Sequence, residues 1–214
     1  MLASAAVITF CLNILSALVA LMTSYYAYKV HRLIPNSLLW AISIGFMFLG
    51  VGLAVDAGTS LVSGRTLVQS LSDRVLTILA SLTYLTIQMV AYLIIAVGYA
   101  RVAYGNQIKV AAPVVLAGSA IAGLYRYSLL SYFVVLILLA FIVFQGLLLR
   151  SGEKKGLSGM VLLAFILIFV AHLLLLISVL TLGSGLFLIG TVAQFFGFLS
   201  LLVFVLRSEV VGPR

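Results

Sequence analysis

The sequence predicts an all-α integral membrane protein, folded as a single bundle of seven transmembrane helices. Three observations lead to this class: the composition, the lengths of the uncharged runs and the distribution of the basic residues. Of the 214 residues, 65% are hydrophobic and only 7% are charged, and the mean hydropathy is +1.36. An average soluble domain carries about 25% charged residues. The composition therefore excludes a soluble enzyme, and it equally excludes a disordered chain.

Uncharged runs predict the helices in order along the chain, because a helix needs about 20 apolar residues to cross a bilayer. The run 156–206 is long enough for two helices, and a glycine–serine turn at 181–185 separates them. The run 110–125 is short, and it spans only if Lys109 and Arg126 extend toward the two surfaces. We expect the longest loop at 60–74. The expected helices lie near 3–29, 37–59, 75–103, 109–125, 127–149, 157–180 and 185–206.

The basic residues predict how the bundle is oriented. Seven crossings place nine lysines and arginines on one side and three on the other, which is the asymmetry of the positive-inside rule. We therefore expect the amino terminus outside and the carboxyl terminus inside, in a multi-pass protein of the plasma membrane. Without a crossing at 109–125, the basic cluster at 150–155 would move outside. The net charge of +8 then reflects orientation and contact with the lipid bilayer, and nucleic acid is not an expected partner.

Two segments share a pattern that predicts an internal repeat. Gln, an aromatic residue, Leu, Val and Arg recur at identical offsets, in Gln88, Tyr92, Leu93, Val97 and Arg101 and again in Gln194, Phe198, Leu199, Val203 and Arg207. Within a single transmembrane domain, 1–214, the repeat halves would be 1–104 and 127–208, joined by a linker helix at 109–125; chance matching of apolar residues is the alternative. This 3+1+3 order resembles the topology of the SWEET sugar facilitators and implies a transporter of two halves. No Pro-Gln pair occurs, so the resemblance transfers no residues.

Four polar side chains are predicted at membrane depth, where such groups are costly. Each lies thirteen to seventeen residues from the basic inner end of its helix, or roughly 20–26 Å. They are Asn13, Gln88, His172 and Gln194, and the residues expected to border them are Ser43, Tyr84, Thr86 and Thr191. Two interpretations are open. The layer forms a substrate-binding pocket, or its members hydrogen-bond neighbouring helices together.

The residue types bound the chemistry of this layer. Counting from Asn36 places Asp56 at the outer edge, so we expect no carboxylate in the layer and a neutral or weakly charged solute. His31 lies too far from His172 for one chain to bind a haem through both. The sequence has one cysteine, Cys11, and lacks the common catalytic and metal-binding motifs. We therefore expect no enzyme activity, no metal site and no cofactor.

The sequence leaves three function classes open. The first is a small transporter or facilitator for a neutral or weakly charged solute. The second is a non-catalytic subunit or scaffold of a larger membrane complex, respiratory or haem-associated, and the third is a seven-helix sensor. Small residues such as Gly45, Gly50, Gly118 and Gly123 predict close helix packing, within the chain or at a contact with a second copy or other membrane subunits.

Overall fold

The chain is a multi-pass, all-helical integral membrane protein. The computed structural model describes the backbone of residues 2–65, 71–104, 128–151, 159–181 and 184–210. These residues contain six helices long and apolar enough to cross a membrane. The helices are α1 (Leu2–Leu33), α2 (Ser37–Arg65), α3 (Leu71–Tyr104), α5 (Ser128–Ser151), α6 (Gly159–Thr181) and α7 (Ser184–Val210).

Six of the expected helical ranges are confirmed, with ends that differ by a few residues. The glycine–serine turn separates α6, which ends at Thr181, from α7, which begins at Ser184. The expected helix at 109–125 lies outside the described residues. The expected loop at 60–74 is too long, because α2 continues to Arg65 and α3 already begins at Leu71. The helical backbone extends beyond the apolar runs here, where the sequence has no proline to interrupt it.

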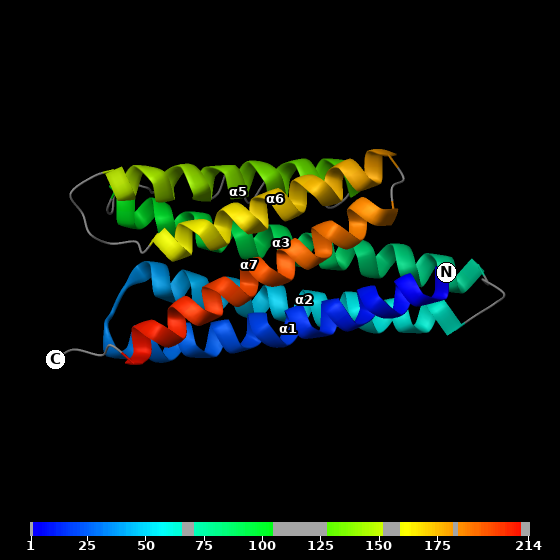
Figure 1. Ribbon diagram of the computed structural model, residues 1–214, viewed down its shortest axis with the longest axis horizontal. Helices are drawn as coiled ribbons and strands as arrows, with labels where there is room; N and C mark the ends of the chain where they lie inside the picture. Colours follow the sequence, from blue (N-terminus) through cyan, green and yellow to red (C-terminus); the bar gives the residue numbers. More distant parts are fainter. Residues whose placement is uncertain (1, 66–70, 105–127, 152–158, 182–183, 211–214) are drawn as a thin grey trace.

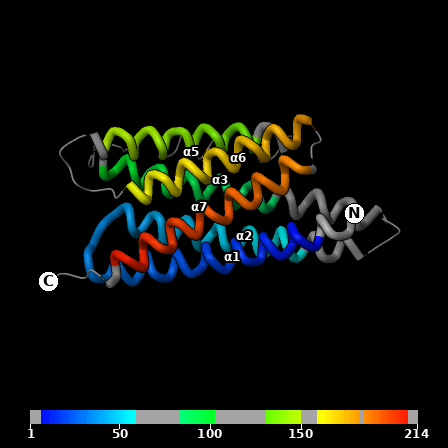
Figure 2. The backbone as a smooth tube through the Cα atoms, in the orientation of Figure 1, coloured from blue at the N-terminus to red at the C-terminus, as the bar shows by residue number. Residues whose placement is uncertain are grey.

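The helices form a closed ring in the described part of the chain. The backbone of each lies close to those of two others, in the order α1, α2, α3, α5, α6, α7 and back to α1. Figure 1 shows that α1, α3, α5 and α7 run in one direction along the long axis, whereas α2 and α6 run in the other. The tube in Figure 2 shows the same arrangement, with α7 crossing the bundle obliquely from the end of α6 toward the end of α1.

A short turn joins α1 to α2 and uses His31 as a structural group. The backbone N–H of Asn36 donates to Nδ1 of His31 at 3.1 Å, and the N–H of Leu38 donates to Oδ1 of Asn36 at 2.8 Å. Asn36 therefore caps the amino terminus of α2. His31 belongs to this turn, at the end of the bundle where α1 finishes.

Glycines place α2 close to both of its neighbours. A Cβ on Gly45 would lie 2.6 Å from Cγ1 of Ile95 on α3, and one on Gly50 would lie 2.7 Å from Cγ of Leu21 on α1. A side chain at either position would force its neighbour to shift, and small residues are common where membrane helices approach closely. The expected crowding of α2 is confirmed, while Gly118 and Gly123 lie outside the described residues.

Aromatic side chains fill the middle of the ring. Phe46 on α2 and Phe198 on α7 meet edge to face, with ring centroids 5.3 Å apart. Tyr99 on α3 and Phe165 on α6 meet in the same way at 5.7 Å. All four side chains are buried. These contacts join helices that are not neighbours in the ring, so the interior is packed by side chains.

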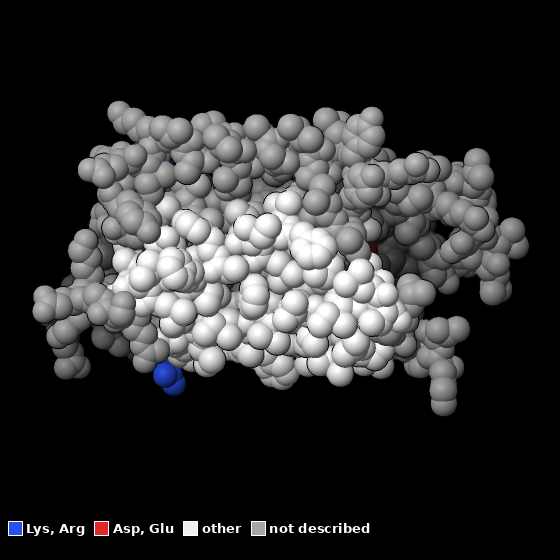
Figure 3. All heavy atoms as spheres, turned by 90° about the horizontal axis from the view of Figure 1, so that it is seen from above, with Lys and Arg blue, Asp and Glu red and all other residues white. Residues whose placement is uncertain are grey.

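The outer surface of the bundle is apolar. Large hydrophobic side chains are exposed on several helices, including Leu18, Met22, Ile137, Phe144, Leu163, Leu180 and Phe196. In Figure 3, uncharged residues cover the middle of the visible face, a basic side chain lies toward one end and an acidic one toward the other. A surface of this kind suits lipid tails rather than water.

Candidate polar site in the bundle interior

The four polar residues predicted at membrane depth are all buried. Their exposed fractions are 7% for Asn13, 1% for Gln88, 0% for His172 and 4% for Gln194. They come from α1, α3, α6 and α7 respectively. Gln88 and His172 are in direct contact. Gln194 lies near Tyr84 of the same site, and Asn13 pairs with Asp56.

Gln88 and His172 form a hydrogen bond across the ring, from α3 to α6. Nε2 of Gln88 lies 2.5 Å from Nε2 of His172, and Nδ1 of His172 lies 2.8 Å from the carbonyl oxygen of Ile168. A carbonyl oxygen only accepts, so Nδ1 carries the ring proton and donates. Nε2 of the neutral imidazole then accepts from the Gln88 amide. These two bonds hold His172 in one tautomer and one orientation.

One face of α3 supplies the rest of this site. Tyr84, Gln88 and Tyr92 follow one another at intervals of four residues, which places them on the same side of a helix. The Tyr92 ring meets the His172 ring edge to face, with centroids 5.5 Å apart. Tyr84 lies within hydrogen-bonding reach of the side chain of Gln194 on α7.

Two polar atoms at this site have no hydrogen-bond partner within the described part of the chain. They are Nε2 of Gln194 and the hydroxyl oxygen of Tyr92, and both are inaccessible to solvent. The side chain of Gln88 lies near the Tyr92 hydroxyl, but the two groups do not meet with the geometry of a hydrogen bond. Buried polar groups in folded proteins are nearly always hydrogen-bonded, to protein or to ordered water. An amide N–H and a hydroxyl at this site are thus left without a protein partner among the described residues.

Asn13 is paired with a carboxylate, which corrects the expectation that the layer contains none. Nδ2 of Asn13 donates to Oδ2 of Asp56 at 3.0 Å, from α1 to α2. The error came from measuring each residue along its own helix. Because α1 and α2 are antiparallel about one turn, residues equally far from Pro35 meet, and Asn13 lies 22 residues before it while Asp56 lies 21 after it. Counting from Pro35 would therefore have predicted the contact between Asn13 and Asp56 from the sequence.

Asp56 connects the Asn13 pair with the rest of the site. Its charge acts on the hydroxyl groups of Tyr84 on α3 and Tyr132 on α5. Tyr84 is therefore near the charge of Asp56 and also within hydrogen-bonding reach of the Gln194 side chain. The sequence predicts Tyr84 only as a bordering residue, and its patterns did not identify Tyr92 or Tyr132 as members of the site.

The three other residues expected to border the layer are not seen to bond to its four members. The hydroxyl of Ser43 donates to the carbonyl of Ser24 at 3.0 Å and so joins α2 to α1. The hydroxyl of Thr191 donates to the carbonyl of Phe187 in its own helix at 2.9 Å. Thr86 is exposed. Hydroxyl groups in membrane helices commonly bond to backbone carbonyls in this way.

The polar groups of this site differ in whether they already have hydrogen-bond partners. Among the described residues, no group of three His, Cys, Asp or Glu side chains is placed to hold a metal ion. Both nitrogens of His172 are already occupied by hydrogen bonds. The groups without a partner are the amide N–H of Gln194 and the hydroxyl of Tyr92, and such groups can hydrogen-bond to oxygen and nitrogen atoms.

Comparison with known proteins gives no relative: no protein family, no curated protein and no solved structure matches this chain. A proposal about its function therefore rests on the geometry of the site.

Proposed function

We propose that this protein is a small transporter or facilitator for a neutral or weakly charged polar solute. The solute binds inside the bundle among Gln88, His172 and Gln194, by bonding to Gln194 and Tyr92 beside the Gln88–His172 pair, with Asn13 and Asp56 at the edge of the same site. One observation carries the proposal: Nε2 of Gln194 and the Tyr92 hydroxyl are buried with no partner in the described part of the chain. An unsatisfied buried group costs about 1–3 kcal/mol, and a bound solute would remove that cost.

The polar groups define the class of solute. Gln194 donates through its amide, whereas Tyr92 both donates and accepts. Polyols, sugars and small amides carry the matching hydroxyl and carbonyl groups. Asp56 acts on the site through Tyr84, so a weakly basic solute fits the site better than an anion. The proposal assigns the chain no catalytic reaction, no metal and no cofactor.

The proposed topology has seven crossings, with the amino terminus outside and the carboxyl terminus inside. Its support is the direction of the helices. The end of α3 and the start of α5 lie at opposite ends of the bundle (Figure 1), so an odd number of crossings between them fits the chain. The positive-inside rule then gives the orientation.

The proposed mechanism is a rocking motion of two three-helix halves, α1–α3 and α5–α7. Two features support a repeat. The two halves run in the same order of directions: α1 and α5 run one way along the long axis, α2 and α6 run the other way, and α3 and α7 run as the first pair does (Figure 1). In addition, Ala91 and Gly197 each follow the repeated glutamine by three residues, and each lies at a close crossing, with Gly45 and Ala164 respectively.

The site lies between these halves. The bond from Gln88 to His172 joins the first half to the second, and so does the contact of Tyr84 with Gln194. Transporters built from repeats typically bind substrate at the repeat interface. Movement of one half against the other would open and close the site without unfolding either half.

Solute flux into liposomes tests the proposal. Purified protein is reconstituted, and the uptake of glycerol, urea, small sugars and small amides is followed by stopped-flow light scattering. We expect at least one solute to enter faster than in protein-free liposomes. Gln194→Leu should slow that flux about tenfold, because loss of one hydrogen bond to the solute costs roughly 1.4 kcal/mol.

Thr191→Val is the matched control. Thr191 is buried on the same helix, and its hydroxyl bonds within that helix, so the variant should retain the flux of the native protein. An unchanged flux in Gln194→Leu would refute the proposed site. If every solute of the panel entered no faster than in protein-free liposomes, transport of this solute class would be refuted.

A further inference from the structure

We propose that a groove between α2 and α3, on the outside of the bundle, is a binding site for an anionic phospholipid. The groove has a volume of about 250 Å³ and is lined by ten residues of these two helices: Ser37, Trp40, Ala41, Ile44, Val90, Leu93, Ile94, Val97, Gly98 and Arg101. It does not include any residue of the interior polar site. The inference is therefore independent of the proposed transport function.

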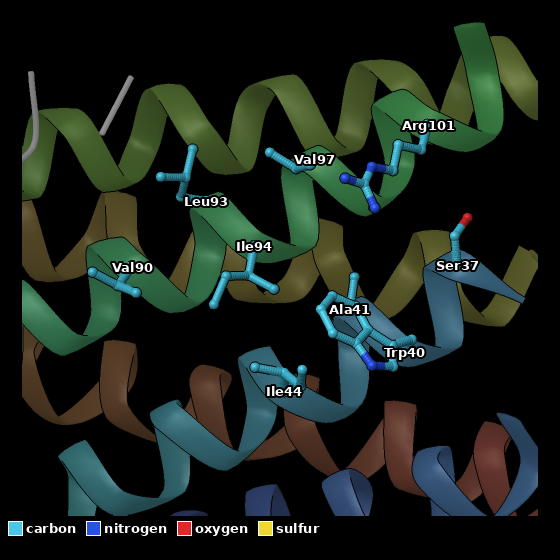
Figure 4. A pocket seen from close by; sticks show the side chains of 10 residues that line it. Ser37, Trp40, Ala41, Ile44, Val90, Leu93, Ile94, Val97 and Arg101 are labelled. Carbon is cyan, nitrogen blue, oxygen red and sulfur yellow. The ribbon is translucent and has the colours of Figure 1, made fainter. Parts of the chain in front are cut away.

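The groove exists because its floor is made of very small residues. A Cβ on Gly98 would overlap the Cβ of Ala41, so α2 and α3 touch at this point. Larger side chains stand on either side of the contact, with Trp40 and Ile44 on α2 and Ile94 on α3 (Figure 4). Two helices that meet through small residues, flanked by large ones, leave a channel along their contact line.

The walls of the groove match a hydrocarbon chain. Apart from Ser37 and Arg101, the side chains that line it are apolar or, in Trp40, largely so. On α3 the lining extends from Val90 to Arg101, eleven residues further along, which is roughly 16 Å of helix. One leaflet contributes half of the ~30 Å hydrocarbon core. The groove is thus as long as the depth that one acyl chain occupies in its leaflet.

The polar end of the groove matches a lipid phosphate. Arg101 and Ser37 lie together at one end, and the Arg101 side chain extends along the groove toward Val97 (Figure 4). Helix α2 begins at Ser37, so the positive end of its dipole lies there as well. A guanidinium group and a hydroxyl placed above an apolar channel are the contacts that a phosphate with an attached acyl chain requires.

The charge around this end favours an anionic lipid. Helices α1, α3 and α7 all finish at the same end of the bundle (Figure 1). The exposed basic side chains there are Lys29, Arg32, Arg101 and Arg207. The one acid whose side chain the structure describes, Asp56, follows Ser37 by 19 residues in α2 and lies at the far end. Basic pockets between membrane helices are common sites for anionic headgroups.

Native mass spectrometry of the full chain in detergent tests the site. The probe is dioleoyl phosphatidylglycerol, and its retention is compared with that of dioleoyl phosphatidylcholine. We expect one phosphatidylglycerol to be retained preferentially. Arg101→Gln should reduce that retention about fivefold, the factor expected for one arginine at an anionic surface.

Matched variants separate a built site from general effects. Arg207→Gln removes an exposed arginine at the same end of the bundle that is outside the groove, and it should reduce retention less than twofold. Val97→Trp places an indole in the groove and should lower retention as much as Arg101→Gln. Val170→Trp, at an exposed position on α6, should leave it unchanged.

Three results would overturn the inference. If Arg101→Gln and Arg207→Gln lowered the retention of phosphatidylglycerol equally, the lipid would be held by the overall positive charge of this end and not by the groove. If phosphatidylcholine were retained as well as phosphatidylglycerol, the groove would bind acyl chains without selecting the headgroup. Competition by glycerol 3-phosphate as effective as that by the lipid would show a phosphate site without an acyl-chain groove.

Discussion

At the scale of single residues, the hydrogen bond between Gln88 and His172 organises the interior of the bundle. The Ile168 carbonyl determines which nitrogen of His172 carries the proton, and this makes the other nitrogen an acceptor for Gln88. The pair joins α3 to α6, whose backbones are not adjacent in the ring and which meet only through side chains. A polar contact across a packed apolar interior aligns the two helices axially, because a shift of either helix would leave both groups buried without partners.

A double-mutant cycle measures this pair directly. Gln88→Leu and His172→Phe each remove one partner at similar volume, and each leaves the other group buried without it. We expect both single variants to lower the free energy of unfolding in detergent. The double variant should lose less than the sum, giving a coupling energy of about 0.6–1.7 kcal/mol, the range of hydrogen bonds between membrane helices. A coupling energy of zero would contradict the bond.

The sequence was sufficient to predict that four polar residues are buried, but not which of them meet. Counting along a helix gives the depth of a residue, whereas contact also depends on the direction in which it faces and on the neighbouring helix. Gln88 and Gln194 occupy equivalent places in the repeated pattern. Nevertheless, Gln88 contacts His172 and Gln194 contacts Tyr84. Asn13 meets Asp56 because α1 and α2 are antiparallel about their connecting turn. Counting residues separately from the basic end of each helix did not take this turn into account.

At the scale of helices, small residues determine how closely neighbours pack. Lipid tails are as apolar as leucine, so membrane helices associate through close packing and polar contacts rather than through the hydrophobic effect. Gly45 and Gly50 let α2 approach α3 and α1 respectively, and Gly190 and Gly197 let α7 approach α6. Hydropathy predicts six of these helices well because it depends on composition alone. It does not predict ring order, which depends on these local contacts.

Exchange of two small residues tests the crossing of α2 and α3. In Gly98→Ala the new Cβ meets the Cβ of Ala41, and neither group can rotate away, so the helices must separate. We expect a loss of about 1–3 kcal/mol in the free energy of unfolding. Adding Ala41→Gly should restore most of the lost free energy of unfolding, because positions 41 and 98 together then carry one methyl group, as in the native protein.

Gly58→Ala is the control for this exchange, since Gly58 lies in α2 and a Cβ added to it would have no neighbouring atom within 4 Å. Alanine there should leave stability unchanged or raise it by up to about 1 kcal/mol through its higher helix propensity. Thermal or denaturant unfolding in one detergent compares all four proteins. A double variant as unstable as Gly98→Ala would mean that Ala41 is not the obstructing group.

At the scale of the whole molecule, the ring of helices explains how a small chain can enclose a polar site. The outer surface is apolar, and aromatic side chains pack against each other across the middle of the ring. The polar groups of the site are buried in this interior, where a hydrogen bond is electrostatically stronger than in water. The proposed halves meet at this site, so the overall architecture and the proposed mechanism both depend on the directions of the helices.

Cysteine labelling tests those directions and the proposed number of crossings. Cys11 is the single cysteine, so Cys11→Ser gives a background in which Arg101→Cys, Thr181→Cys and Arg207→Cys each introduce one exposed thiol, near the ends of α3, α6 and α7. With a membrane-impermeant maleimide, we expect Thr181→Cys to react in intact cells. The other two should react only after permeabilisation, because α3 and α7 end on the side opposite to the end of α6.

Labelling of the α3 and α7 positions from opposite sides would refute the seven crossings. Labelling of both in intact cells, with Thr181→Cys protected, would preserve the crossings and refute the orientation.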